Sequence, residues 1–152
     1  SLDVYRNMKG TDEMVSKTYA MAELMGIEDL LEREISGLSL GEMRRALIAR
    51  ALVTDPKMLT LDEPMTGLDI VMSSKFRQMF DILISQGVNI VMITHDLSDI
   101  PESIDRVVML KDGAKIADGS KRDLLNDETV SRVFGEPVKV ECTGGVYRMH
   151  LV

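Results

Sequence analysis

Two adjacent carboxylates, Asp62 and Glu63, have the clearest capacity for chemistry in this sequence. They end a short apolar run that begins at Lys57, and Pro64 prevents the run from continuing as a strand. An ionised carboxylate is costly to desolvate unless something pairs with it, so two acids at the end of a predicted buried strand require a reason. A bound cation would supply that reason, and so would a water molecule that needs a base.

A histidine follows the next predicted strand. Residues 88–93 form a second short apolar run, and His95 comes two residues after it. A predicted helix from Met72 to Gly87 separates the two runs. Strand, helix and strand in this order indicate a parallel pair joined by a right-handed crossover. Because functional groups collect at the carboxyl ends of such strands, we expect His95 to lie near the two acids.

Two carboxylates and a histidine at neighbouring strand ends suit several reactions. One acid can hold Mg²⁺ through water, because that ion keeps part of its hydration shell. The other acid can orient or deprotonate an attacking water. The histidine can reach charge that develops on a transferring phosphoryl group. A lone histidine at a strand end is more often structural, and it is the company of Asp62 and Glu63 that favours a catalytic role.

Residues 38–43 carry a dense helix-start signal. Ser39 and Glu42 have the spacing of a capping box, and Leu38 and Met43 have that of a hydrophobic staple. The helix is expected to run to about Val53 and to be largely buried after its first turns. A well-capped helix explains this pattern without any function. The functional alternative is that Gly41 allows close approach and that backbone N–H groups meet an anion.

The remaining elements are predicted from caps and turns. A helix capped at Thr11 or Asp12 runs to Met25 and is closed by Gly26, with methionines on its apolar side. Hairpins are expected around residues 111–113 and 143–145, with two capped helices between them, the second of which ends at Gly135. We divide the chain into a partial helical subdomain at 1–36, a core at 37–136 and a terminal hairpin at 137–152.

Composition narrows the class of function. The 152 residues include 18 basic and 25 acidic side chains, for a net charge of −7, which argues against a nucleic-acid partner. Cys142 is the only cysteine, which suits a reducing compartment. No signal peptide and no apolar run long enough to span a bilayer are visible, so a membrane role would come through a partner.

Four motifs in order resemble those of ABC-type ATPases. Residues 38–42 resemble the signature motif, residues 58–63 the Walker B strand and residues 66–69 the D-loop. His95 stands where that family has its switch histidine. The resemblance implies an α/β fold: a partial P-loop NTPase core with parallel strands and crossover helices, preceded by a helical subdomain and followed by β-hairpins.

The resemblance also implies roles for single residues. Glu63 would be the catalytic base and His95 would steady the γ-phosphate of ATP, while Asp62 would hold Mg²⁺ through water. The signature would bind nucleotide of a second subunit and the D-loop would join the two sites. These two motifs contribute Ser39, Leu40, Gly41 and Glu42, and Gly67, Leu68 and Asp69.

Two substitutions and one absence set this sequence apart from the family pattern. Leu40 replaces the usual first glycine and Glu42 the usual glutamine of the signature. No Gly-x-x-x-x-Gly-Lys-Ser/Thr loop occurs in residues 1–152, so little in them would hold a triphosphate. We therefore expect a C-terminal fragment that is inactive alone. Its exposed sheet edge is expected to favour dimers.

The favoured function is the ATP-hydrolysing subunit of an ABC transporter, working as a head-to-tail pair with a second nucleotide-binding domain. Transmembrane permease subunits would anchor it to the cytoplasmic face of the cell membrane. The alternatives are a soluble ABC-type ATPase acting on ribosomes or chromosomes, and a non-catalytic interaction fragment. The tail hairpin and the compact helical segment look similar to ATPases of metal-complex or cofactor importers, a faint lead that leaves the transported substrate and the direction open.

Overall fold

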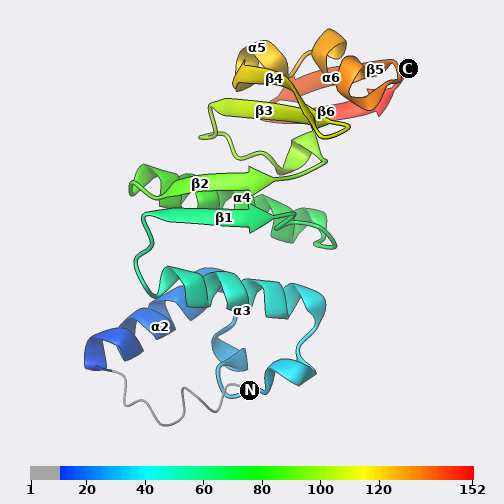
Figure 1. Ribbon diagram of the computed structural model, residues 1–152. Coiled ribbons are helices and arrows are strands. Elements are labelled where there is room, and N and C mark those ends of the chain that lie inside the picture. Colours follow the sequence, from blue (N-terminus) through cyan, green and yellow to red (C-terminus); the bar gives the residue numbers. More distant parts are fainter. Residues whose placement is uncertain (1–10) are drawn as a thin grey trace. The chain divides into compact units, whose positions relative to one another are not determined.

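The computed structural model describes residues 11–152, and Figure 1 labels its elements. The chain divides into two compact units, one that ends at Leu59 and one that begins at Thr60. The proposed division at 36 and 136 stays a prediction. The helices and strands, in chain order, are α2 (Asp12–Met25), η1 (Glu28–Leu30), η2 (Ile35–Gly37), α3 (Leu40–Leu52), β1 (Met58–Asp62), α4 (Ile70–Ser85), β2 (Asn89–Ile93), η3 (Leu97–Asp99), β3 (Arg106–Lys111), β4 (Ala114–Ser120), α5 (Lys121–Leu124), α6 (Asp127–Phe134), β5 (Val138–Thr143) and β6 (Val146–Leu151).

Helices α2 and α3 pack against each other in the first unit. The Thr11 hydroxyl accepts from the Met14 N–H at 3.3 Å, and α2 ends at Gly26, whose left-handed φ of 58° suits glycine. The Arg45 guanidinium of α3 donates to the Met25 and Gly26 carbonyls at 3.2 and 2.9 Å. The Arg45 side chain therefore donates to carbonyls that have no hydrogen-bond partner within α2, because they lie at the end of that helix.

The burial expected for these two helices is only partly right. In α2 the buried side chains are Ala22 and Met25, whereas Met14 is 49% exposed. In α3, Leu47 is 49% exposed and burial is confined to one side of the helix, at Ile48, Ala49 and Leu52. Helix α3 therefore has a one-sided contact with its unit, and the apolar composition after Arg45 overstated its burial.

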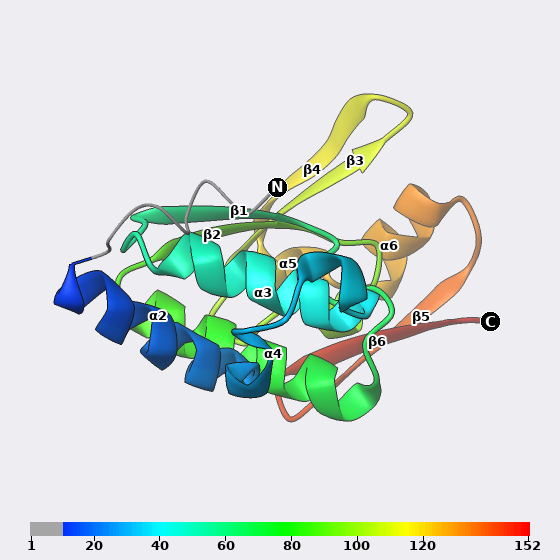
Figure 2. The same ribbon diagram turned by 90° about the horizontal axis from the view of Figure 1, so that it is seen from below.

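Strand β1 crosses the boundary at Leu59 and Thr60, and it is a hydrogen-bonded neighbour of β2, with the arrows of the two strands pointing the same way (Figures 1 and 2). Helix α4 connects them and packs against β2. The Asp69 carboxylate caps α4 by accepting from the Val71 and Met72 N–H groups. The predicted helix after Met72 is thus present, and one face of α4 is buried through Phe76, Met79, Phe80 and Leu83.

Neither strand is buried in the way that its apolar composition predicts. Leu59 is the buried residue of β1, and β2 has none, with Val91 48% and Ile93 56% exposed. Within residues 11–152 this sheet has two strands, so both of its edges are open. A continuous apolar run predicts that both faces are covered, and burial of both faces needs layers that a two-stranded sheet with one helix does not supply.

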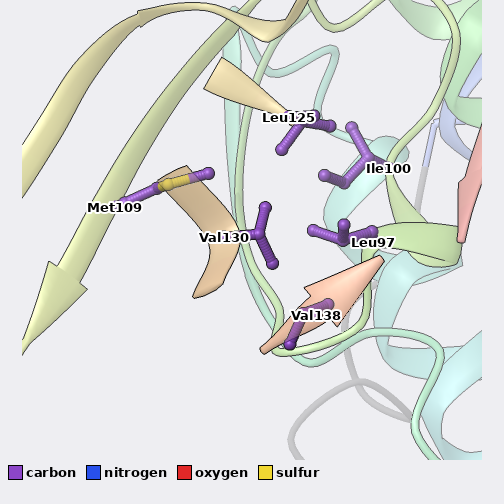
Figure 3. Packing of buried hydrophobic residues seen from close by; sticks show 6 residues of the cluster. All are labelled: Leu97, Ile100, Met109, Leu125, Val130 and Val138. Atoms are coloured by element: carbon purple, nitrogen blue, oxygen red, sulfur yellow. The ribbon is translucent and has the colours of Figure 1, made fainter. Parts of the chain in front are cut away.

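The C-terminal part of the second unit is built from two antiparallel hairpins, β3–β4 and β5–β6, with α5 and α6 between them in the chain. Both hairpins and the helix stop at Gly135 agree with the predictions. The side chains of the core cluster lie close to one another in Figure 3, where they come from helices, strands and the loop after β2. Its buried members are Leu97, Ile100, Met109, Leu125, Val130 and Val138.

Candidate functional site

The carboxyl ends of β1 and β2 bring Glu63 and His95 into contact. The Glu63 N–H donates to the Ile93 carbonyl at 2.9 Å, which extends the pairing of the strands one residue past the end of β1. The His95 Nδ1 atom then lies 2.9 Å from Glu63 Oε1. Two residues that are 32 positions apart in the sequence thus meet at the edge where the crossover arrangement predicts them to meet.

The turn after β1 holds Glu63 in an unusual backbone conformation. Glu63 has a φ of 44°, in the left-handed region that few residues other than glycine adopt. The next two residues, Pro64 and Met65, are buried and anchor the turn. The Thr66 N–H donates to the Glu63 carbonyl at 3.3 Å and closes it. Strain of this kind persists only where the surrounding structure holds it, and it clusters at functional sites.

A second side chain also reaches the Glu63 carboxylate. The Thr66 hydroxyl donates to Glu63 Oε2 at 3.0 Å, so one carboxylate oxygen meets Thr66 and the other meets His95. This contact of Thr66 was not predicted from the sequence. The signal that could have found it is a hydroxyl residue three positions after the acid, across a proline-containing turn, where a short side chain can bond back.

The pair remains open to solvent. The Glu63 side chain is 43% exposed and that of His95 is 68% exposed. A polar contact that is this exposed contributes little to stability, so stability does not explain its geometry. A polar contact at hydrogen-bonding distance whose two side chains are accessible to solvent can also be reached by a substrate.

Asp62 is the last residue of β1, and it is exposed. No group of three or more His, Cys, Asp or Glu side chains gathers as a metal site within residues 11–152. A single carboxylate does fit Mg²⁺, because this ion keeps several waters and is often held by one or two carboxylates and a phosphate. The residues present therefore fit a magnesium ion held mainly by water and substrate.

The loop after His95 has its own hydrogen bonds. The Thr94 hydroxyl donates to Asp99 Oδ2 at 3.0 Å, and Asp96 Oδ1 accepts from the Ser98 N–H at 2.8 Å. Burial is the main cause that raises the pKa of Asp99 above its ordinary value, and the bond from Thr94 opposes it. These contacts fix the backbone on either side of His95 and limit where its ring can lie.

The predicted signature residues form a complete capping box at the start of α3. The Ser39 hydroxyl accepts from the Glu42 N–H at 3.3 Å, and Glu42 Oε2 accepts from the Ser39 N–H at 2.7 Å. Hydrogen bonds from Ser39 hold the pKa of the Glu42 carboxyl below its ordinary value. Leu40 is 58% exposed and Gly41 is half-buried, so the helix start faces solvent. This box is confirmed.

The predicted D-loop forms the turn between β1 and α4. Gly67 has a φ of 80°, a conformation that favours glycine, and the Leu68 N–H donates to the Met65 carbonyl at 3.1 Å. Asp69 follows as the cap of α4, with both cap bonds on Oδ1. Glu63 and Asp69 therefore belong to one continuous, hydrogen-bonded turn within the second unit.

The comparisons with known proteins all point to ABC transporter proteins. The family model described as ABC transporter matches residues 1–66. An uncharacterized ABC transporter ATP-binding protein of Methanocaldococcus jannaschii is 34% identical over 137 residues, which cover 90% of this chain and 54% of that protein. An energy-coupling factor transporter ATP-binding protein of Latilactobacillus sakei is 39% identical, over 85% of this chain and 46% of its own length. The chain spans about half the length of these curated relatives.

Solved structures agree with the fold. A metal-chelate type ABC transporter in an inward-facing conformation superposes with a TM-score of 0.77 at 23% identity, covering 96% of this chain and 59% of that one. The ADP conformation of an ATP-binding cassette of an ABC transporter superposes with a TM-score of 0.69 at 28% identity. The match covers 88% of this chain and 55% of that one. None of the helices within residues 11–152 has the length and apolar run needed to cross a lipid bilayer. Residues 1–66 thus match the ABC transporter family, most of the chain is similar to ATP-binding proteins of ABC transporters, and its fold is that of the corresponding part of their ATPase domain.

Proposed function

We propose that these residues supply the hydrolytic side of an ATP site in the ATP-hydrolysing subunit of an ABC transporter. The observation that carries the proposal is the 2.9 Å contact between His95 Nδ1 and Glu63 Oε1 at the exposed ends of two neighbouring strands. The matched relatives are named as transporter ATP-binding proteins, including one from an energy-coupling factor system. They do not favour the alternative of an ATPase acting on ribosomes or chromosomes.

Glu63 acts as the base that orients and deprotonates the attacking water. An ionised carboxylate only accepts hydrogen bonds, so Nδ1 carries the hydrogen of the contact with His95. The Nε2 atom is then the ring position that meets the γ-phosphate, and it donates there when the ring is an imidazolium. Phosphoryl transfer depends mainly on positioning and charge stabilisation, and this pair supplies one group for each.

Asp62 holds Mg²⁺ through water on the side of the nucleotide phosphates. When bound, the ion neutralises charge on those phosphates. Asp62 and Glu63 are adjacent in sequence but differ in setting, because Asp62 ends β1 while Glu63 begins the turn. This difference lets one acid face the metal and the other face the water.

The start of α3 binds the γ-phosphate of a partner subunit's ATP. The residues involved are Ser39, Leu40, Gly41 and Glu42. The Ser39 hydroxyl accepts from Glu42 N–H, and its own hydrogen can be donated to a phosphate oxygen. The helix dipole favours an anion at this end. The capping box keeps the Glu42 carboxylate on the Ser39 N–H, which limits the repulsion that this acid would exert on phosphate.

The proposed assembly is a head-to-tail pair of nucleotide-binding domains beneath transmembrane permease subunits, at the cytoplasmic face of the membrane. Gly67, Leu68 and Asp69 join the two ATP sites, and closure on ATP drives the permease. The relatives' names support the transporter setting, since one is called an energy-coupling factor transporter protein. No nucleic acid takes part, in agreement with the net charge of −7.

The test is phosphate release from ATP by the full-length protein with its permease. Glu63→Gln is expected to lower kcat by about 10²-fold or more, as loss of a general base does. Glu141→Gln makes the same chemical change at an exposed site on β5 and is expected to retain the wild-type rate. A Glu63→Gln variant that hydrolyses ATP as fast as the wild type contradicts the proposal.

The 152 residues alone are proposed to be inactive, because they contain no phosphate-binding loop. The open edges of the β1–β2 sheet, with Val91 and Ile93 half exposed, are proposed to favour self-association of the isolated chain. ATPase activity of this isolated chain that Glu63→Gln abolishes would refute the first statement. A stable monomer in light scattering after size exclusion would refute the second.

A further inference from the structure

We propose that Thr66 is a positioning residue for Glu63, and that its hydroxyl fixes the orientation of the carboxylate for catalysis. The inference rests on the proposed function, because it concerns the group that activates water. It starts from a contact within one turn: Thr66 Oγ1 lies 3.0 Å from Glu63 Oε2. Thr66 itself acts only through Glu63.

The two contacts of the carboxylate have complementary effects. His95 Nδ1 meets Oε1 at 2.9 Å, and Thr66 Oγ1 meets Oε2 at 3.0 Å. The terminal torsion of a glutamate side chain has broad minima, so a single partner leaves the carboxylate plane poorly fixed. Partners on both oxygens fix the plane. The lone pairs of the carboxylate then point in defined directions, which is what a base needs toward one particular water.

The backbone makes Thr66 a stable partner. Its N–H donates to the Glu63 carbonyl at 3.3 Å, and the two intervening residues, Pro64 and Met65, are buried. The hydroxyl therefore belongs to the same closed turn as the acid that it contacts. Glu63 has a φ of 44°, and its N–H donates to the Ile93 carbonyl at 2.9 Å, so the turn that carries the acid and the hydroxyl is also tied to β2.

A turn-stabilising bond would have the same geometry, so the two roles must be separated by their consequences. If Thr66 only stabilises the turn, removal of its hydroxyl lowers stability and leaves the turnover of folded protein unchanged. If Thr66 positions the base, kcat falls while ATP binding stays the same, because the base acts in the transition state. A serine keeps the hydroxyl and should restore the rate, whereas valine keeps the shape and should not.

The experiment compares Thr66→Val, Thr66→Ala and Thr66→Ser in the full-length transporter. The expected result is a kcat about tenfold lower in the valine and alanine variants, an unchanged KM for ATP, and a serine variant within about twofold of the wild type. Thr143→Val is the matched control, since Thr143 is an exposed residue at the end of β5. Binding of a fluorescent ATP analogue measures the ground state separately.

Two results would overturn the proposal. One is that Thr66→Val and Thr66→Ala keep the wild-type kcat, and the other is that Thr66→Ser loses as much rate as they do. Failure of the proposed function looks different, because wild type and Glu63→Gln would then have equal rates. If the protein with Thr66→Val does not fold, Thr66→Ala still removes the hydroxyl and provides the same test.

Discussion

Two polar clusters in the second unit differ in their exposure to solvent. At the ends of β1 and β2, Glu63 and His95 contact each other and are 43% and 68% exposed. In the C-terminal part, Lys121 is 9% exposed, and its amine donates to the Pro101 and Glu102 carbonyls at 3.0 and 2.7 Å. The Tyr147 ring lies 5.9 Å from the same nitrogen.

This difference in exposure distinguishes a cluster that stabilises the fold from one that can act on a substrate. The Lys121 amine donates to one buried and one partly buried carbonyl, and these bonds link the segment before β3 to the start of α5. The strand-end pair differs in its exposure, because both of its side chains face solvent and can be reached by a ligand. Polar clusters of the first kind hold a fold together, and those of the second kind can act on a substrate.

The largest effect on stability is expected in the apolar core beside Lys121. Leu125→Ala removes a side chain that is 4% exposed in the cluster of Figure 3, and should cost about 2–5 kcal/mol of unfolding free energy. Leu151→Ala is the matched control, because Leu151 is 72% exposed and should change stability by less than about 0.5 kcal/mol. Urea denaturation measures both. Equal losses would mean that the cluster is not the core of this region.

Lys121→Met is expected to cost about 1–3 kcal/mol, because it leaves the buried Pro101 carbonyl and the partly buried Glu102 carbonyl without their donor. Desolvation lowers the pKa of the Lys121 amine below its ordinary 10.5. Between the lowered pKa and 10.5 the unfolded chain binds more protons, so the wild type gains stability from this group as the pH rises. The cost of Lys121→Met, followed by urea denaturation, should therefore grow from neutral to alkaline pH. A cost that shrinks over that range contradicts the assignment.

The smallest effect is expected at an exposed charge cluster on β3 and β4. Asp118 accepts from Arg106 and Lys115 at 3.0 and 2.9 Å, and these cations lower its pKa to about 2. A lowered acid pKa gives stability that is present above 3.8 and is lost as the pH falls through about 2. The difference in melting temperature between wild type and Asp118→Asn should be small, be reduced by salt, and shrink from pH 5 to pH 2.5. A difference that grows on acidification would contradict it.

Much of this structure could be predicted from local signals. The caps at Thr11, Ser39 and Asp69, the turn at Gly113 and the stop at Gly135 depend on residues next to one another in the chain. The meeting of Glu63 and His95 could be predicted as well, because strand–helix–strand order places both at one sheet edge. Order and local chemistry were sufficient for these features.

Other features depend on parts of the chain that lie far apart in sequence. Burial of Lys121 requires the carbonyls near Pro101 and the ring of Tyr147, 20 and 26 positions away, so its sequence position at a helix start gave no sign of it. The exposure of β1 and β2 depends on which strands and layers lie beside them, which an apolar run does not state. The composition of a segment indicates which side chains could be buried, but it does not indicate which other segments pack over them.

Urea unfolding of Glu63→Gln beside the wild type tests most directly whether the strand-end pair exists for chemistry. The pair is exposed and lies in a strained turn, so its removal should change the free energy of unfolding by less than about 0.5 kcal/mol, even though hydrolysis is lost. A loss of more than about 1.5 kcal/mol would place Glu63 among the groups that hold the fold together, as Lys121 does, and would contradict this account.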